Sequence, residues 1–254
     1  MSTIPKLLKL KDYVTLTGAS LGLIALSLGA IGTRYTITFG FFLLSLTLGT
    51  DLIDGYIARK TGTFNELGRE LDSLSDSLTF GITPAILTFQ AFRTGQIYDI
   101  ILIIGCVLFA LGAILRLARF NISTGKGYTG VPTPISALLV IIFYFANYFY
   151  AFGLGGLSQS FPDIAYYSIP AFLVLIGWLN ITTLIKFKEK SKSTYYIIIL
   201  IAPTVPIFGI IGLMNPDLIV SMIVALILII LFFVALIWIF AVYIHSIYLK
   251  LKQK

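Results

Sequence analysis

The sequence predicts an all-α fold, a polytopic membrane bundle of about eight transmembrane helices preceded by an amphipathic helix at the membrane interface. Composition is the first observation behind this prediction. Hydrophobic residues make up 58% of the 254 residues, charged residues make up 11%, and the mean hydropathy is +0.98. Soluble globular proteins have about 45–50% apolar and about 25% charged residues. The composition therefore excludes disordered chains, collagen-like chains and ordinary soluble enzymes.

The apolar residues form continuous runs, which favours helices over the alternating strands of a membrane β-barrel. A helix that crosses the hydrocarbon core needs roughly 20 predominantly apolar residues. The stretches that meet this criterion are about 14–33, 36–59, 68–92, 97–119, 132–153, 166–186, 194–213 and 217–246. Residues 1–12 are short and amphipathic, so we expect them to lie along the interface. The polar breaks are short, and we therefore expect residues 1–254 to form a single domain.

The distribution of basic residues predicts the orientation of this bundle, because Lys and Arg collect on the cytoplasmic side. With the N-terminus inside, all of the 18 Lys and Arg residues except Arg34 and Arg93 fall in cytoplasmic segments. We therefore expect a protein of the cell (plasma) membrane with both termini in the cytoplasm. The same bias accounts for the net charge of +7 without a nucleic-acid partner. A single cysteine, Cys106, excludes an internal disulfide and any cysteine-based metal cluster.

Four aspartates stand out because they fall inside the second and third predicted spans: Asp51, Asp54, Asp72 and Asp76. A carboxylate in a membrane helix is costly unless something offsets it. The first two are three residues apart and the last two are four apart, so each pair shares one helix face. The short loop between the spans makes the helices antiparallel, and both acidic faces can converge near the cytoplasmic side. Pairing with Arg59 and Arg69 would neutralise two carboxylates and leave two unexplained.

Carboxylate oxygens in this number are suited to Mg²⁺ or Mn²⁺ and can hold two ions. Gly55, Ala58 and Gly68 lie on the same faces and leave room for a ligand to approach the backbone. Metal ions held by carboxylates are a common means of stabilising charge in phosphoryl transfer. A cation or metabolite transporter is the alternative, because intramembrane carboxylates also mark ion paths. In a transporter we would expect acidic residues distributed through the membrane, whereas these four all lie in one helical hairpin.

Residues 51–76 read DLIDGYIARKTGTFNELGRELDSLSD. This segment resembles the CDP-alcohol phosphatidyltransferase family, whose signature is D-x2-D-G-x2-A-R-x8-G-x3-D-x3-D. All specified residues are present at the family's spacing: Asp51, Asp54, Gly55, Ala58, Arg59, Gly68, Asp72 and Asp76. The resemblance implies a displacement at the diphosphate of a CDP-lipid, with CMP as the leaving group. It also implies a catalytic core of about residues 12–186, peripheral helices over about 194–246, and a homodimer.

The same resemblance implies roles for the signature residues. The first three aspartates would bind metal and the CDP moiety. Gly55, Ala58, Arg59 and Gly68 would also contact the CDP moiety. Asp76 would share in metal binding or act as the general base that deprotonates the acceptor hydroxyl. Relatives often have an asparagine at the position of Gly18, so Thr15 or Thr17 would take its place near the nucleotide.

Two later segments, LRLARFN (115–121) and YTGVPTPISA (128–137), resemble the phosphatidylserine synthase branch of this family. That branch implies L-serine as acceptor and CDP-diacylglycerol or CDP-archaeol as donor. The planar guanidinium groups of Arg116 and Arg119 suit the carboxylate of serine or the lipid phosphate. Anchoring to anionic headgroups is the alternative for both. Asn121, Lys126 and Thr133 would add polar contacts.

Serine is not the only acceptor that the signature allows. Glycerol phosphate and inositol phosphate remain alternatives, although each carries a phosphate and would need more cationic ligands than these segments supply.

Overall fold

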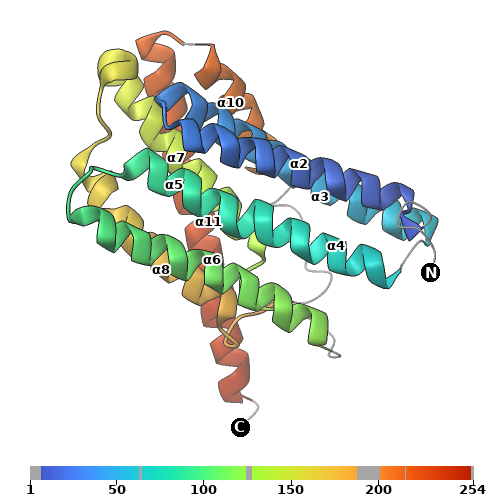
Figure 1. Ribbon diagram of the computed structural model, residues 1–254. Helices are drawn as coiled ribbons and strands as arrows, with labels where there is room; N and C mark the ends of the chain where they lie inside the picture. The colour runs from blue at the N-terminus through green and yellow to red at the C-terminus, as the bar shows by residue number, and fades with distance from the viewer. Residues whose placement is uncertain (1–6, 63–64, 124–127, 188–200, 215, 253–254) are drawn as a thin grey trace.

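A computed structural model describes residues 7–62, 65–123, 128–187, 201–214 and 216–252, which form a bundle of long helices (Figure 1). The all-α prediction is confirmed. Two strands of two residues each, β1 (Tyr128–Thr129) and β2 (Lys186–Phe187), pair in antiparallel fashion beside the bundle. In chain order the helices are α2 (Leu10–Ile31), α3 (Arg34–Thr61), α4 (Glu66–Asp76), the π-helix η1 (Ser77–Ile82), α5 (Thr83–Phe92), α6 (Tyr98–Ile122), α7 (Thr133–Gly155), the 3₁₀ turn η2 (Gly156–Ser158), α8 (Asp163–Ile181), α10 (Thr204–Leu213) and α11 (Leu218–Lys252).

Within the described residues, six helices are long and apolar enough to cross a membrane: α2, α3, α6, α7, α8 and α11. The chain is therefore an integral membrane protein. The expected third span is built from α4, η1 and α5, which follow one another without a break. Of the expected seventh span, α10 covers 204–213, and residues 194–200 lie outside the described part of the chain.

The start of the first span differs from the prediction. Helix α2 begins at Leu10, so Lys11 and Asp12 belong to this helix and not to a separate interfacial segment. Both side chains are buried, and Lys11 Nζ donates to Asp12 Oδ1 at 2.7 Å. Mutual neutralisation explains why two charged residues tolerate this position. Residues 1–6 of the expected interfacial helix lie outside the described residues.

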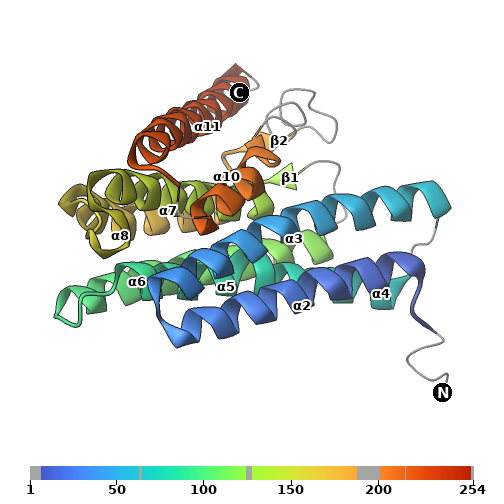
Figure 2. The same cartoon turned by 90° about the horizontal axis from the view of Figure 1, so that it is seen from above.

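Helix α7 forms the centre of the bundle, and 16 of its 23 residues are buried. The helices α2 and α3 pack against each other on one side of it, and α6 packs on α8. Helix α11 crosses α7 on the side away from α2 (Figure 2). Aromatic rings fill the interior, such as Phe41 stacked on Tyr144 with ring centroids 4.0 Å apart.

The hairpin between α3 and α4 determines where the aspartates lie. Gly62, with a φ of 63°, ends α3 in the left-handed conformation that glycine adopts without strain. Asn65 then starts α4 by accepting a hydrogen bond from the backbone N–H of Gly68 at 3.0 Å. The short connection makes the helices antiparallel, so Asp51 and Asp54 near the end of α3 face α4, as predicted.

Candidate active site

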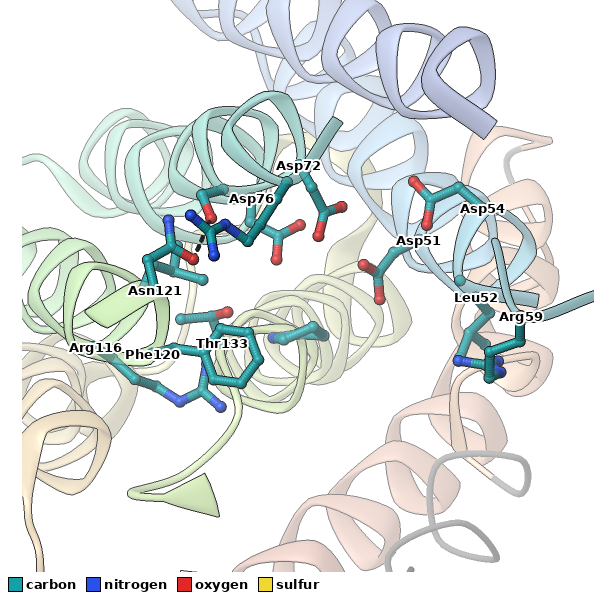
Figure 3. A pocket seen from close by; sticks show the side chains of 15 residues that line it. Asp51, Leu52, Asp54, Arg59, Asp72, Asp76, Arg116, Phe120, Asn121 and Thr133 are labelled. Carbon is teal, nitrogen blue, oxygen red and sulfur yellow. Dashed lines mark hydrogen bonds between the residues drawn. The ribbon is translucent and has the colours of Figure 1, made fainter. Parts of the chain in front are cut away.

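Three of the four predicted aspartates form one cluster. Asp51, Asp72 and Asp76 each offer a carboxylate oxygen, and these oxygens all lie within 4.8 Å of one another. They line a cavity of about 360 Å³, the Asp76 cavity, between α3, α4 and the end of α6. Figure 3 shows Asp72 and Asp76 from α4 facing Asp51 from α3 across this cavity. The π-helix η1 begins directly after Asp76, and such segments occur frequently at functional sites.

The fourth aspartate, Asp54, is held beside the cluster by α2. The Thr15 hydroxyl donates to Asp54 Oδ2 at 2.7 Å, and both residues are buried. The Ser75 hydroxyl of α4 in turn donates to the Thr15 carbonyl at 3.4 Å. Hydrogen bonds therefore connect α2 with α3 and α4 at this point, and Asp54 lines both cavities of the site.

A second cavity of about 670 Å³, the Gly68 cavity, adjoins the first on the other side of Asp54 and Asp72. It is lined by the predicted nucleotide ligands Thr15, Gly55, Ala58, Arg59 and Gly68, and also by Lys11, Asn65, Glu66, Arg69 and Phe120. Both cavities share Asp54, Gly55, Arg59, Arg69, Asp72 and Phe120. The two cavities therefore adjoin at Asp54 and Asp72.

Gly68 is a glycine for a steric reason. A Cβ atom at this position would lie 2.6 Å from Asp12 Oδ1 and would also collide with Lys11 Nζ and Asn65 Oδ1. The missing side chain lets the Lys11–Asp12 pair of α2 approach α4 closely. Lys11 therefore lies at the wall of the Gly68 cavity, where its ammonium is an N–H donor whose charge is balanced by Asp12.

Residues from the second half of the chain complete the Asp76 cavity. Arg116 and Asn121 of α6 and Thr133 of α7 all line it, as the sequence predicts. The Ser73 hydroxyl of α4 donates to Asn121 Oδ1 at 3.0 Å, which holds this amide beside the aspartates (Figure 3). Thr133 is fully buried, and among the described residues its hydroxyl has no hydrogen-bond partner. A buried hydroxyl left in this state at a cavity is available to a substrate.

One predicted ligand, Arg119, lines neither cavity. Arg119 Nη1 donates to the Ile181 carbonyl at 2.6 Å, and Nη2 donates to the carbonyls of Thr129 at 3.0 Å and Asn180 at 3.3 Å. The guanidinium thus donates hydrogen bonds to carbonyl groups at the end of α8 and in β1. Arg119 therefore positions the chain that follows α6. Lys126 lies outside the described residues.

The donor set fits a divalent cation. Mg²⁺ and Mn²⁺ prefer carboxylate oxygens, and the site offers at least three from two helices. Two neighbouring cations are engaged elsewhere, since Lys11 pairs with Asp12 at 2.7 Å and Arg69 with Glu70 at 3.4 Å. Four aspartates line the Asp76 cavity with three arginines, Arg59, Arg69 and Arg116, and Arg69 is paired with Glu70, so the cavity retains negative charge that a metal ion can neutralise.

Comparison with known proteins agrees with this site. The sequence profile of the CDP-alcohol phosphatidyltransferase family matches residues 12–185, which include all four aspartates. The chain belongs to this family. It is therefore a transferase enzyme, and enzymes of this family are generally dependent on divalent cations.

Individual relatives carry more specific names. A protein of Methanocaldococcus jannaschii named CDP-diacylglycerol–serine O-phosphatidyltransferase is 34% identical over 83% of this chain and 89% of its own length. A Methanothermobacter thermautotrophicus protein named archaetidylserine synthase is 34% identical over 58% of this chain and 62% of its own length. A Helicobacter pylori protein with the same name as the first is 31% identical over 66% of this chain and 70% of its own length.

The structure adds site residues that the sequence did not reveal. Five of them line one or both cavities: Lys11, Asn65, Glu66, Arg69 and Ser73. A sixth, Asp12, accepts a hydrogen bond from Lys11 Nζ. A signal for Asp12 was present, because it directly follows a segment with three lysines (Lys6, Lys9 and Lys11), and a charged residue is costly at the start of a membrane helix. Ser73 gave no signal, since its contact with Asn121 joins residues 48 positions apart.

Proposed function

We propose that this chain transfers a phosphatidyl or archaetidyl group from a CDP-lipid to the hydroxyl of L-serine and releases CMP. One observation carries the proposal: the Asp76 cavity joins the signature aspartates to Arg116, Asn121 and Thr133. These three residues come from the segments that resemble the serine-specific branch. The names of the relatives support the same acceptor and both kinds of lipid.

In this proposal the reaction is a displacement at phosphorus. The serine hydroxyl oxygen forms a bond to the phosphorus that carries the lipid, and the bond from that phosphorus to the bridging oxygen breaks. CMP leaves with the electron pair of the broken bond. Asp76 accepts the proton of the serine hydroxyl, since it lies in the same cavity as the proposed serine ligands.

The two cavities divide the substrates between them. The Gly68 cavity takes the CDP moiety, with Lys11 and Arg59 near its phosphates and Thr15, Gly55 and Ala58 along its wall. The Asp76 cavity takes serine, whose carboxylate matches the guanidinium of Arg116 and whose polar groups match Thr133 and Asn121. Asp51, Asp54, Asp72 and Asp76 would hold Mg²⁺ or Mn²⁺, two ions in all. When bound, the metal neutralises charge that develops on the diphosphate.

The membrane arrangement follows from the charges. The basic residues favour a cell-membrane protein with both termini and the aspartate end of the bundle in the cytoplasm. CDP and serine then remain in water while the lipid enters sideways from the inner leaflet. We also propose that the chain is a single domain with its catalytic core over about 12–186, and that it forms a homodimer.

A competition among acceptors tests the proposal. The purified chain, reconstituted with CDP-diacylglycerol and Mg²⁺ or Mn²⁺, receives equal concentrations of L-serine, glycerol 3-phosphate and inositol phosphate. Mass spectrometry of the lipid product should find phosphatidylserine in excess. A product containing glycerol phosphate or inositol phosphate would keep the reaction class and overturn the choice of serine.

A further inference from the structure

A third cavity lies at the end of the bundle opposite the aspartates. Its volume is about 170 Å³, and the start of α3, the end of α5, α7 and the segment before α8 enclose it. We call it the Arg34 cavity. Arg34 precedes Asp51 by 17 positions on the same helix, so about 25 Å of helix separates the two sites.

Arg34 is fixed in place by contacts on its faces and at one nitrogen. Its guanidinium carbon lies 4.7 Å from the ring centroid of Phe161 and 5.4 Å from that of Tyr148. Nη1 donates to the Leu157 carbonyl at 2.9 Å and also to the Gln159 carbonyl. These contacts determine which edge of the guanidinium remains available.

The remaining edge consists of Nε and Nη2. Both nitrogens are buried, and neither has a hydrogen-bond partner within the described part of the chain. The side-chain oxygen of Gln90, which lines the same cavity, is also buried and without a partner there. Buried polar atoms in this state are rare and costly, so three around one small cavity mark it as a site for a polar ligand.

The chemistry of these atoms defines the ligand. The Nε and Nη2 hydrogens of an arginine point in parallel and bind two oxygens of one phosphate or carboxylate. The Gln90 oxygen is an acceptor and needs a donor such as a hydroxyl group. A phosphate group that carries a P–OH, or that is joined to a hydroxyl-bearing headgroup, satisfies both requirements at once.

Arg93 does not line the Arg34 cavity but places a second positive charge beside the lining residue Gly32. Its Nη2 lies 3.3 Å from the position that a Cβ of Gly32 would occupy, and Gln90 Oε1 lies 3.9 Å from the same point. No acidic residue occurs among the described residues that line the cavity; the nearby Asp163 lies one helical turn before the lining residue Tyr166. Arg34 and Arg93 are the two basic residues that the charge pattern assigns to the side opposite the aspartates.

We propose that the Arg34 cavity binds a phosphate group through the Nε–Nη2 edge of Arg34, with Gln90 as acceptor and Arg93 as a second cation. The phosphate is supplied by the headgroup of a phospholipid in that leaflet or by inorganic phosphate. The site is separate from the active site, so its occupancy does not depend on which acceptor alcohol the enzyme uses.

The test uses the purified full chain and two substitutions. Gln90→Glu keeps the shape of the side chain but places a carboxylate beside Arg34, where it competes with any anion. Arg34→Lys keeps the charge and removes the Nε–Nη2 edge. Lys250→Gln, at an exposed residue in the last turn of α11, is the control for a general loss of positive charge.

One arm measures retention of phosphatidylglycerol by native mass spectrometry after reconstitution in mixed phosphatidylglycerol and phosphatidylcholine nanodiscs. The other measures the shift in melting temperature that inorganic phosphate produces in detergent. We expect binding of at least one probe to the native chain and to Lys250→Gln, and at least roughly tenfold weaker binding to Gln90→Glu and Arg34→Lys. Phosphatidylglycerol retention alone identifies a lipid headgroup, and a phosphate response identifies the free ion. The proposal is wrong if the native chain binds neither probe, or if Gln90→Glu folds and binds both as the native chain does.

Discussion

The Thr15 hydroxyl of α2 donates a hydrogen bond of 2.7 Å to the Asp54 carboxylate of α3, although 39 residues separate them in sequence. This bond fixes one of the signature aspartates from outside the signature. It also assigns a physical role to the first membrane helix, which otherwise presents mainly small and apolar residues to its neighbours. The geometry of the acidic centre therefore depends on how α2 packs against α3.

Replacing Thr15 tests this dependence. Thr15→Val keeps the shape and removes the donor, so Asp54 is no longer held in one orientation. Because hydrogen bonds to charged groups contribute about 1.5–3 kcal/mol, we expect kcat/KM for CDP-lipid to fall about tenfold to hundredfold. Thr15→Ser keeps the hydroxyl and should retain most of the activity. Equal activity of the Val and native enzymes would contradict the role of this bond.

Gly68 offers a steric test of the second cavity. Gly68→Ala places a Cβ 2.6 Å from Asp12 Oδ1 and displaces the Lys11–Asp12 pair from α4. We expect a raised KM for CDP-lipid and weaker binding of CMP, measured by calorimetry. Gly49→Ala in α3 is the control, since a Cβ there meets no atom within 4 Å. If both alanine variants bind CMP like the native enzyme, the Gly68 cavity does not hold the nucleotide.

Arg116 and Arg119 should respond differently to the same substitution. Arg116 lines the Asp76 cavity, so Arg116→Lys should raise KM for serine about tenfold through loss of the bidentate contact. Arg119 donates to three backbone carbonyls, so Arg119→Lys should lower the melting temperature and leave KM for serine nearly unchanged. The reverse pattern would exchange the roles of the two residues.

The contact between α6 and α8 predicts a stability effect without a change in chemistry. A Cβ on Gly112 would lie 2.8 Å from the Gly177 Cα, so Gly112→Ala must push the helices apart. Overpacking of this kind costs about 1–3 kcal/mol, and we expect a lower melting temperature in detergent. A melting temperature equal to that of the native chain would mean that the helices do not approach this closely.

Asp76 has the most specific proposed role. Asp76→Asn removes the proton acceptor and should lower kcat for CMP release by about 10²–10⁴-fold, with CMP binding largely retained. Asp217→Asn alters an exposed carboxylate just before α11 that lines neither cavity, and it serves as the control. Unchanged CMP release by the Asn variant would refute the assignment of Asp76 as the base.

The central features of the site were predictable because they are local. Helical spacing places Asp51 with Asp54, and Asp72 with Asp76, on single faces, and a short loop is enough to bring the two faces together. Continuous apolar runs likewise predict most of the membrane helices, since span length is set by the thickness of the bilayer.

The remaining features depend on tertiary contacts that spacing does not encode. Arg116 and Arg119 are both arginines of helix α6. Arg116 nevertheless lines the Asp76 cavity, while Arg119 donates hydrogen bonds to carbonyls of α8 and β1. The buried position of Lys11 and Asp12 depends on the absence of a side chain at Gly68, 56 positions after Asp12. Neither contact follows from periodicity or charge pattern alone.

The most direct test of the proposed function is the rate of CMP release from CDP-diacylglycerol as a function of L-serine concentration. The purified, reconstituted enzyme should release CMP in a saturable, serine-dependent manner, with one phosphatidylserine formed for each CMP. Release that is independent of serine, or that begins only when another alcohol is added, would contradict the proposal.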